Sequence, residues 1–442
     1  METFFQSITK EMLSFIQNSP SVYHVADNIL QTCVQQGFVP LKEQEEWKLQ
    51  PGGKYIVLRN DSAILAFVLP DKRADEIKGF HITASHGDSP GFKVKENPEI
   101  HVEEHYTKWS TEGYGGMLIS TWFDRPLSAA GRVFYSENGK ICSKLVDLQE
   151  SIGVIPSLAI HMNRNANKGV EYHLQKDTLP LICSFEKSDE QCYEKTTGQS
   201  KGAFTKVLAE KAGLSQDDIL DYDLFLYVKQ EGQYVGLNQE WVLSPNLDDL
   251  LCVYASMRAF LSVSPVEYIN MLAVFDYEEV GSGSGQGADS DFLENTCRRI
   301  AQSLDGTKSI YERWLADSFL LSCDNAHGVH PNFPEMSDAT NRPYLNGGLV
   351  LKYQGSLKYT TDGYSGAKVK QWCRQAEVPC QTYANRSDLP GGSTLGHIAL
   401  SHTSIKAADI GIAQLGMHSA VEMAGVKDTG YMMKALQEFY KE

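Results

Sequence analysis

Two observations predict an α/β fold with a mainly parallel central sheet flanked by helices, together with an inserted β-rich domain. From about Trp241 to the end of the chain, apolar strand-like runs alternate with helix-like segments, as in sheets whose parallel strands are joined by helices. Residues 91–237 instead contain short β-like runs with charged spacers. The sequence therefore predicts one domain from residues 1–90 and 238–442 and a second, inserted domain from residues 91–237.

The first ninety residues supply the opening elements of the larger domain. Residues 4–38 carry apolar side chains at helical spacing, broken once by a proline, which predicts two helices. Residues 54–69 contain two β-rich runs around an Asn-Asp pair, which predicts a hairpin. Residues 81–86 then predict a strand that ends in His86.

Ionisable residues stand at the ends of short apolar runs in five places. They are Glu278 with Glu279, His86 with Asp88, Asp248 with Asp249, Asp324, and His418. In open α/β sheets, binding sites form beyond the carboxyl ends of the strands, so residues far apart in the chain can converge there. Imidazole and carboxylate ligands without cysteine fit catalytic Zn²⁺ or Mn²⁺ better than a structural zinc. Two ions about 3.5–4 Å apart, bridged by one carboxylate, require about this set of ligands.

The adjacent carboxylates Glu278 and Glu279 are the most informative of these residues. Neighbouring residues on a strand point to opposite sides, so one carboxylate can ligate a metal while the other faces the water that reacts. The alternative interpretation is an exposed acidic strand end that is followed by the flexible stretch 281–287. Asp88, two residues after His86, can accept the second ring N–H of that histidine or hold the catalytic water.

Five ordered motifs resemble a known family over nearly the whole chain. The motifs are SHGDSP, SPNLDDL, FDYEEVGSGSGQGA, CDNAHGVHPN and GMHSAVEMAG, and they resemble the M18 metallopeptidases, the aspartyl aminopeptidase family. The resemblance implies a fold of the zinc-peptidase type and two divalent metal ions per subunit, with zinc expected and manganese or cobalt as alternatives. It also implies that the inserted domain mediates dimerisation and that the dimers assemble into a dodecamer.

The same resemblance implies a role for each motif residue. It assigns His86, Asp248 and Asp324 to one ion and Asp248, Glu279 and His418 to the other. Glu278 would be the general base, and Asp88 would orient His86. One departure from the family is Asp249, where members commonly carry Asn; we expect its carboxylate to cap the helix that follows, although weak ligation or a shifted metal preference are alternatives.

Residues of the substrate pocket also follow from the resemblance. Lys352 would meet an acidic substrate side chain, with Tyr359 beside it as a further group for the tetrahedral oxyanion. His161 would complete the site of a neighbouring subunit, and His330 would contact the substrate at the pocket mouth. The alternatives are a lysine whose head lies in water, a histidine at an ordinary interface, and a simple loop histidine.

The implied function is removal of N-terminal Asp or Glu from peptides with a free N-terminus. A related dizinc deacylase or carboxypeptidase is the alternative among hydrolases, and a non-catalytic, metal-stabilised assembly protein is the alternative from another class.

The paired glycines 391 and 392 precede a predicted helix whose first N–H groups could meet a substrate carbonyl or carboxylate.

Composition excludes several other classes of protein. The formal net charge of −16 argues against binding to a phosphate backbone. The nine cysteines show neither metal-type pairing nor a disulfide framework, which is typical of a reducing compartment. The sequence contains neither a signal-peptide pattern nor an apolar run of about 18 residues. We therefore expect a cytoplasmic protein without nucleic-acid or membrane partners.

Overall fold

The computed structural model describes residues 4–103, 105–184, 202–304 and 307–442. The chain forms two compact units. The first unit consists of Met1–Ser89, Gly232–Met417 and Glu422–Glu442, and the second consists of Pro90–Glu231 and His418–Val421. The sequence placed the inserted domain at residues 91–237, and the role of this domain in dimerisation stays a prediction.

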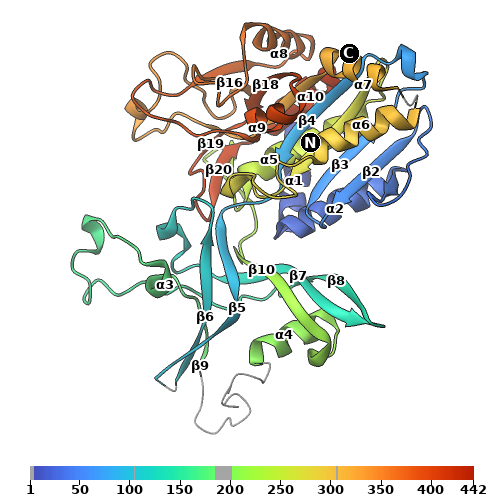
Figure 1. Ribbon diagram of the computed structural model, residues 1–442. Coiled ribbons are helices and arrows are strands. Elements are labelled where there is room, and N and C mark those ends of the chain that lie inside the picture. Colours follow the sequence, from blue (N-terminus) through green and yellow to red (C-terminus); the bar gives the residue numbers. More distant parts are fainter. Residues whose placement is uncertain (1–3, 104, 185–201, 305–306) are drawn as a thin grey trace. The chain divides into compact units, whose positions relative to one another are not determined.

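A nine-stranded mixed sheet forms the centre of the first unit (Figure 1). In sheet order its strands are β1 (Val39–Leu41), β2 (Lys54–Arg59), β3 (Ala63–Val68), β13 (Tyr268–Phe275), β4 (Gly79–His86), β14 (Phe319–Cys323), β18 (Lys406–Gly411), β16 (Leu349–Tyr353) and β17 (Cys380–Ala384). The four middle strands, β13, β4, β14 and β18, run parallel to one another. Strands β3 and β16 pair with this group in the antiparallel sense. The predicted α/β class with a mainly parallel sheet is confirmed.

Both faces of this sheet are buried under helices. On one face lie α1 (Phe4–Gln17), α2 (Val22–Gln35), α5 (Leu247–Ser262), α8 (Gly363–Gln375) and α10 (Asp428–Lys441). On the other lie α6 (Phe292–Leu304), α7 (Lys308–Asp317) and α9 (Leu395–Thr403). Alternate residues of β3 serve the two cores: Ile64 and Ala66 face the first, and Leu65 and Phe67 face the second. Strands buried on both sides are expected to be continuously apolar, as the sequence of β3 is.

A smaller sheet and a hairpin complete the first unit. Strands β2 and β3 form the predicted hairpin, and Asn60 and Asp61 in its turn have φ of 51° and 58°, as a tight hairpin turn requires. The smaller sheet contains β11 (Gln233–Val235), β12 (Trp241–Ser244), β20 (Glu422–Gly425), β19 (Ala413–Leu415) and β15 (Ala326–His327) in that order.

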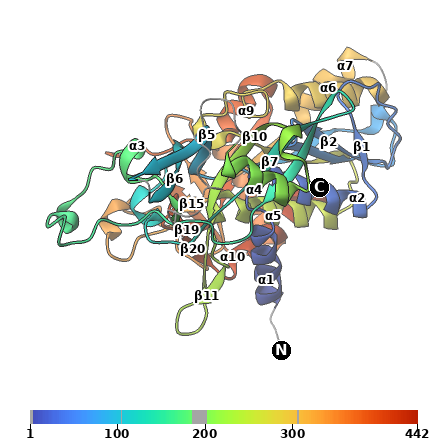
Figure 2. The same ribbon diagram turned by 90° about the horizontal axis from the view of Figure 1, so that it is seen from below.

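The second unit is built on a six-stranded antiparallel sheet (Figures 1 and 2). In sheet order its strands are β8 (Lys140–Asp147), β7 (Leu127–Glu137), β10 (Ile219–Val228), β5 (Gly91–Val102), β6 (Tyr106–Tyr114) and β9 (Leu181–Ser184). Helices α3 (Leu174–Asp177) and α4 (Ala203–Ala212) belong to the same unit. Alternate residues of β10 are buried, the pattern of a sheet that packs mainly one face against its own core. Among the described residues, we found no helix with the length and hydropathy that a membrane crossing needs.

One histidine lies inside the core of the first unit. His81 on β4 is buried, and its ring stacks between Tyr268 and Phe439, with ring centroids 3.8 Å and 4.5 Å away. Burial in this apolar sandwich lowers the pKa of His81 to about 3. The folded protein therefore favours the neutral form of the His81 ring.

The free energy of unfolding should consequently depend on pH through His81. Its pKa is depressed in the folded state, so this contribution is complete above the unfolded pKa of about 6.5 and is lost as the pH falls toward 3. At pH 5 the loss amounts to about 2 kcal/mol. In His81→Phe this pH dependence should disappear, as measured by urea unfolding at pH 7.5 and pH 5 in the presence of a chelator. The control His101→Gln, at an exposed histidine, should behave as the wild type, and equal pH dependence in all three proteins would refute the assignment.

Candidate metal centre and active site

The carboxyl edge of the central sheet gathers most of the predicted site residues. His86 is the last residue of β4, Asp324 directly follows β14, and Glu278 and Glu279 lie in the short helix η6 (Glu278–Val280) after β13. Because β13, β4 and β14 are adjacent and parallel, their carboxyl ends lie at the same edge of the sheet. Asp248 reaches this edge from the start of α5.

Two groups of metal-ligand atoms form within the first unit. One atom each from His86, Asp248 and Asp324 lie within 4.8 Å of one another, and so do atoms of His86, Glu278 and Glu279. Nε2 of His86 is 3.9 Å from Oδ1 of Asp248. A carboxylate oxygen of Asp248 also lies within 4.8 Å of one of Glu279. Asp248 is thus close to the members of both groups, which is the position that a bridging carboxylate needs.

Asp88 holds two parts of the site together. Its two carboxylate oxygens accept hydrogen bonds from the backbone N–H groups of Glu278 and Glu279, each at 3.2 Å. Its Oδ1 also lies 3.4 Å from Nδ1 of His86, and its backbone carbonyl lies 3.0 Å from the same nitrogen. A contact at Nδ1 leaves Nε2 of His86 to face the neighbouring carboxylates. Asp88 therefore links the end of β4 to the acidic pair after β13.

The start of α5 is irregular where it carries Asp248 and Asp249. Both residues have non-helical backbone angles, and the peptide bond between them is cis. The backbone N–H of Asp248 donates to Oε2 of Glu422 at 2.9 Å, and its carbonyl accepts from Ser89 Oγ at 2.9 Å. The sequence favoured Asp249 as a cap of the helix that follows, and the regular part of α5 does begin only after this residue, but its carboxylate is bonded to the end of β4. The buried Asp249 carboxylate instead accepts from the backbone N–H of His86 at 3.4 Å.

The carboxylates of this cluster raise one another's pKa values. Burial raises the pKa of Glu278 to about 8, and the charges of Asp324, Glu279 and Asp88 act in the same direction, against that of His86. The pKa of Asp324 is also raised, mainly by burial. Burial opposes the charged form of His86, but the Asp88 hydrogen bond and nearby carboxylates outweigh it and hold its pKa well above the usual value. Such a concentration of acidic oxygen and imidazole donors fits divalent cations of the zinc type.

Lys352 lies beside a metal-ligand candidate. Its side chain on β16 is only 2% exposed, and its ammonium group lies 3.7 Å from Oδ2 of Asp324 and donates to the carbonyl of Asn325 at 2.8 Å. Nζ also lies 5.3 Å from the ring centre of the buried Tyr359. Burial lowers the pKa of Lys352, but the attraction of Asp324 and Tyr359 has the larger effect and leaves this pKa above its usual value. The amine therefore stays charged. The alternative of a lysine head in water is therefore wrong.

His330 lines a cavity of about 500 Å³ that we call the His330 cavity. Its wall includes His327, Tyr383, Gln414 and the paired glycines 391 and 392. Tyr383 packs edge to face on Tyr359, with ring centres 6.2 Å apart. The His330 cavity therefore lies next to the residues that surround Lys352.

Two predicted residues are grouped with the second unit. His418 lies in the segment His418–Val421, between β19 and β20, and its Nδ1 lies 2.9 Å from the carbonyl oxygen of Gly116. His161 is exposed in the chain before η3 (Ala166–Lys168). Their roles as a metal ligand and as a residue of a neighbouring site stay predictions.

Three functional candidates were missed in the sequence. Glu422 accepts the N–H of Asp248, and Asn325 donates from Nδ2 to the carbonyl of Leu247 and to Oε1 of Gln414. Asp409 is fully buried on β18. Asn325 and Glu422 lie inside the quoted motifs, so their position near predicted ligands could have indicated a role in the site. Asp409 lies outside those motifs, in an apolar strand, and the sequence offered no such indication.

Comparisons with known proteins point to one family. The family model described as aminopeptidase I zinc metalloprotease (M18) matches residues 15–440. A relative from Clostridium acetobutylicum, a probable M18 family aminopeptidase 2, is 43% identical over 434 residues, which is 98% of each chain. The cryo-EM structure of an Ape4 and Nbr1 complex aligns with a TM-score of 0.94 and 32% identity, over 99% of this chain and 86% of that one. The S. cerevisiae mApe1 dodecamer aligns with a TM-score of 0.85 and 28% identity, over 98% and 96% of the two chains.

Divalent metal should stabilise the folded protein, because it neutralises carboxylates that repel one another. Zn²⁺ added to chelator-treated protein at 100 times its Kd should stabilise it by about 3 kcal/mol, seen as a rise in Tm by calorimetry. In Asp324→Asn this rise should be much smaller. The control Asp71→Asn, at an exposed residue, should retain it. A rise of equal size in both variants would exclude Asp324 from the metal site.

Proposed function

Because the chain belongs to the M18 family of aminopeptidases, we propose that it removes the N-terminal residue of peptides at a site for two divalent metal ions. The observation that carries the proposal is the convergence of His86, Asp248 and Asp324 on one edge of the sheet, next to Glu278 and Glu279. A site that served only to bind metal for stability would have no need of a further carboxylate beside its ligands. This argument disfavours a non-catalytic assembly protein.

The proposed ligands divide between the two ions. His86, Asp248 and Asp324 hold the first ion, and Asp248, Glu279 and His418 hold the second. The proximity of the Asp248 carboxylate to both His86 and Glu279 supports the bridging role. His418 has Nδ1 against the Gly116 carbonyl, so Nε2 is the nitrogen that we assign to metal. Zinc fits this set of nitrogen and oxygen donors.

When bound, the two ions would activate a water molecule and polarise the scissile carbonyl. Glu278 takes a proton from the attacking water and later returns it to the leaving amine. Asp88 keeps Glu278 in place through the backbone N–H of that residue. Tyr359 stands beside Lys352 and is our candidate for a hydrogen-bond donor to the oxyanion.

We further propose a preference for Asp or Glu at the substrate N-terminus, with Lys352 as the partner of the acidic side chain. A buried ammonium group binds an acidic side chain favourably, whereas an apolar side chain leaves its positive charge uncompensated. In the structure this ammonium already faces Asp324. A substrate carboxylate would therefore share the lysine with Asp324, which makes the preference sensitive to the geometry around both groups.

Assembly and location complete the proposal. The similarity to the S. cerevisiae mApe1 dodecamer supports a homo-oligomer for this chain, with the second unit as the dimerisation domain. His161 would then enter the site of a neighbouring subunit. We place the protein in the cytoplasm, with peptides rather than nucleic acid as its partners, in keeping with its net charge of −16.

The first test is hydrolysis of aminoacyl substrates carrying Asp, Glu, Leu, Lys or N-acetyl-Asp, with and without chelation and metal addition. We expect turnover of substrates with a free N-terminus and none of the acetylated one. Glu278→Gln should lower kcat by about 100- to 10,000-fold while metal content stays unchanged, because the general base is not a ligand. Turnover of N-acetyl-Asp would favour a deacylase, and a Glu278→Gln variant with full activity would exclude this glutamate as the base.

The acidic preference is tested with Lys352→Met, which keeps the length of the buried stem without its charge. The ratio of kcat/KM for Asp over Leu substrates should fall by about tenfold or more. The matched control is Lys358→Met, an exposed lysine six residues along the chain, which should keep the wild-type ratio. An unchanged ratio in Lys352→Met would show that Lys352 does not determine the substrate preference. Loss of metal in this variant would show that Lys352 acts through Asp324.

A further inference from the structure

Asp409 is a buried carboxylate that the mechanism above does not use. It lies on β18, is fully buried, and stands directly opposite Lys352 in the register of β16 and β18. A charged group without solvent must be satisfied by donors from the protein. The donors to Asp409 come from two different loops, and this arrangement is the basis of the inference.

The first loop that donates to Asp409 is the β16–α8 loop, residues 354–362. Oδ2 of Asp409 accepts from the backbone N–H of Thr360 at 2.5 Å and from the Thr360 hydroxyl at 2.6 Å. The backbone N–H of Asp409 in turn donates to the Thr361 hydroxyl at 2.8 Å. Thr360 directly follows Tyr359. These three bonds therefore fix the backbone next to the tyrosine that packs on Lys352.

The second loop that donates to Asp409 is the β17–α9 loop, residues 385–394. Oδ1 of Asp409 accepts from the hydroxyl of Thr394, the residue that precedes α9. Gly396 in the first turn of α9 is also close: a Cβ there would lie 3.1 Å from the same Oδ1 and 2.7 Å from Ser322 Cβ. The start of α9 is thus packed on Asp409, and a contact of its N–H groups with the substrate stays a prediction.

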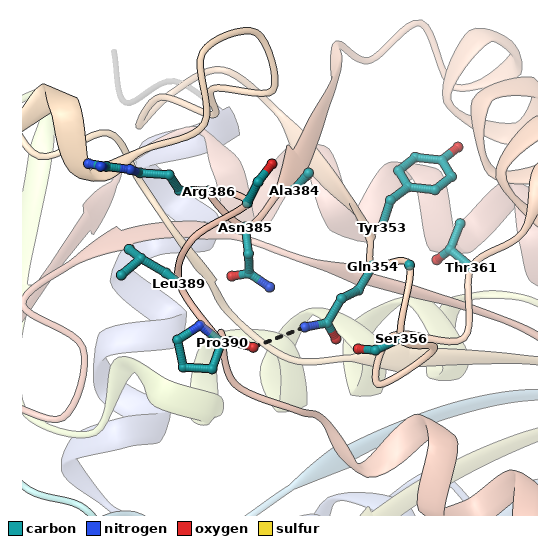
Figure 3. A pocket seen from close by; sticks show the side chains of 11 residues that line it. Tyr353, Gln354, Ser356, Thr361, Ala384, Asn385, Arg386, Leu389 and Pro390 are labelled. Carbon is teal, nitrogen blue, oxygen red and sulfur yellow. Dashed lines mark hydrogen bonds between the residues drawn. The ribbon is translucent and has the colours of Figure 1, made fainter.

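A second cavity, of about 550 Å³, lies between these two loops (Figure 3). The β16–α8 loop lines it with Gln354, Ser356 and Thr361, and the β17–α9 loop lines it with Asn385, Leu389 and Pro390. Figure 3 shows the bond that joins the two loops across it, from Nε2 of Gln354 to the carbonyl of Pro390 at 3.3 Å. Asn385, Leu389 and Pro390 also line the His330 cavity. The β17–α9 loop is therefore the wall between the two cavities.

We propose that Asp409 is a positioning residue that fixes Tyr359 and the wall of the His330 cavity relative to each other, and so determines how the substrate is seated. This inference rests on the proposed function, since it takes Tyr359 and the His330 cavity as parts of the substrate site. Tyr383 extends the same link, because its hydroxyl donates to Oδ1 of Asn385 at 2.6 Å while its ring packs on Tyr359. A single carboxylate thus holds the loops on two sides of the substrate.

The test uses the threonines, because replacing Asp409 itself would disturb a buried charge. Thr394→Val and Thr360→Val keep the shape of the side chain and remove one hydroxyl, and Thr394→Ser and Thr360→Ser keep the hydroxyl as matched controls. The Thr394 hydroxyl donates the bond that ties the β17–α9 loop to Asp409, so Thr394→Val should lower kcat/KM by about tenfold. Thr360→Val retains the backbone bond and should lose less. Both serine variants should remain near wild type, with unchanged metal content and circular dichroism in all four.

Hydrogen exchange of residues 354–361 and 385–394 provides a second readout that does not depend on catalysis. Exchange should rise in both segments in Thr394→Val and stay at the wild-type rate in Thr394→Ser. Wild-type kcat/KM and exchange in both valine variants would overturn the inference. If the wild-type protein hydrolyses no substrate with any metal, the proposed function fails, and the exchange rates alone then support or refute the anchoring by Asp409.

Discussion

The structure depends on the confinement of several carboxylates at the carboxyl edge of four parallel strands. Asp248 and Asp324 are buried there, and Glu278 and Glu279 are half-buried beside them. Like charges at such distances and with so little solvent repel one another strongly. Burial raises the pKa values of Glu278 and Asp324, and repulsion from neighbouring carboxylates raises them further. Positive charge stabilises the ionised form of such a cluster, as the ammonium of Lys352 and the imidazole of His86 do beside Asp324 and Asp88, and it makes the site suitable for divalent cations.

Hydrogen bonds from outside the ligand set keep these carboxylates in position. Asp88 accepts from the backbone of the acidic pair, and Glu422 accepts from the backbone of Asp248. Asn325 joins the start of α5 to Gln414 on β19. Each of these contacts connects segments that are distant in the sequence. Partners of this kind hold potential ligands in geometry before metal binds, so the site is in large part preformed by the protein.

The sequence predicted the fold and the site unequally, for physical reasons. The parallel sheet was predictable because apolar strand-like runs such as 269–275 and 319–323 alternate with helix-like segments, and acidic residues directly after those runs indicated a site at their shared edge. Asp248, Asp324 and His86 could be proposed for the same reason, supported by the family resemblance. The contact of Lys352 with Asp324 could not be predicted, because the register of β16 against β18 is set by tertiary packing. Asp249 and Asp409 were misjudged or missed because their partners, His86 and the loop threonines, lie far away in the chain.

The position of Lys352 connects metal binding to the two loops. Its ammonium is attracted by Asp324 and by Asp409, and both carboxylates help to raise its pKa against the effect of burial. Asp324 belongs to the proposed metal site, while Asp409 anchors Thr360 and Thr394. A cation bound at Asp324 would offset part of the attraction of that carboxylate for the lysine, and would leave Asp409 and any substrate carboxylate as the main partners of the ammonium group. Metal occupancy and substrate selection are therefore expected to be coupled through one buried ammonium group.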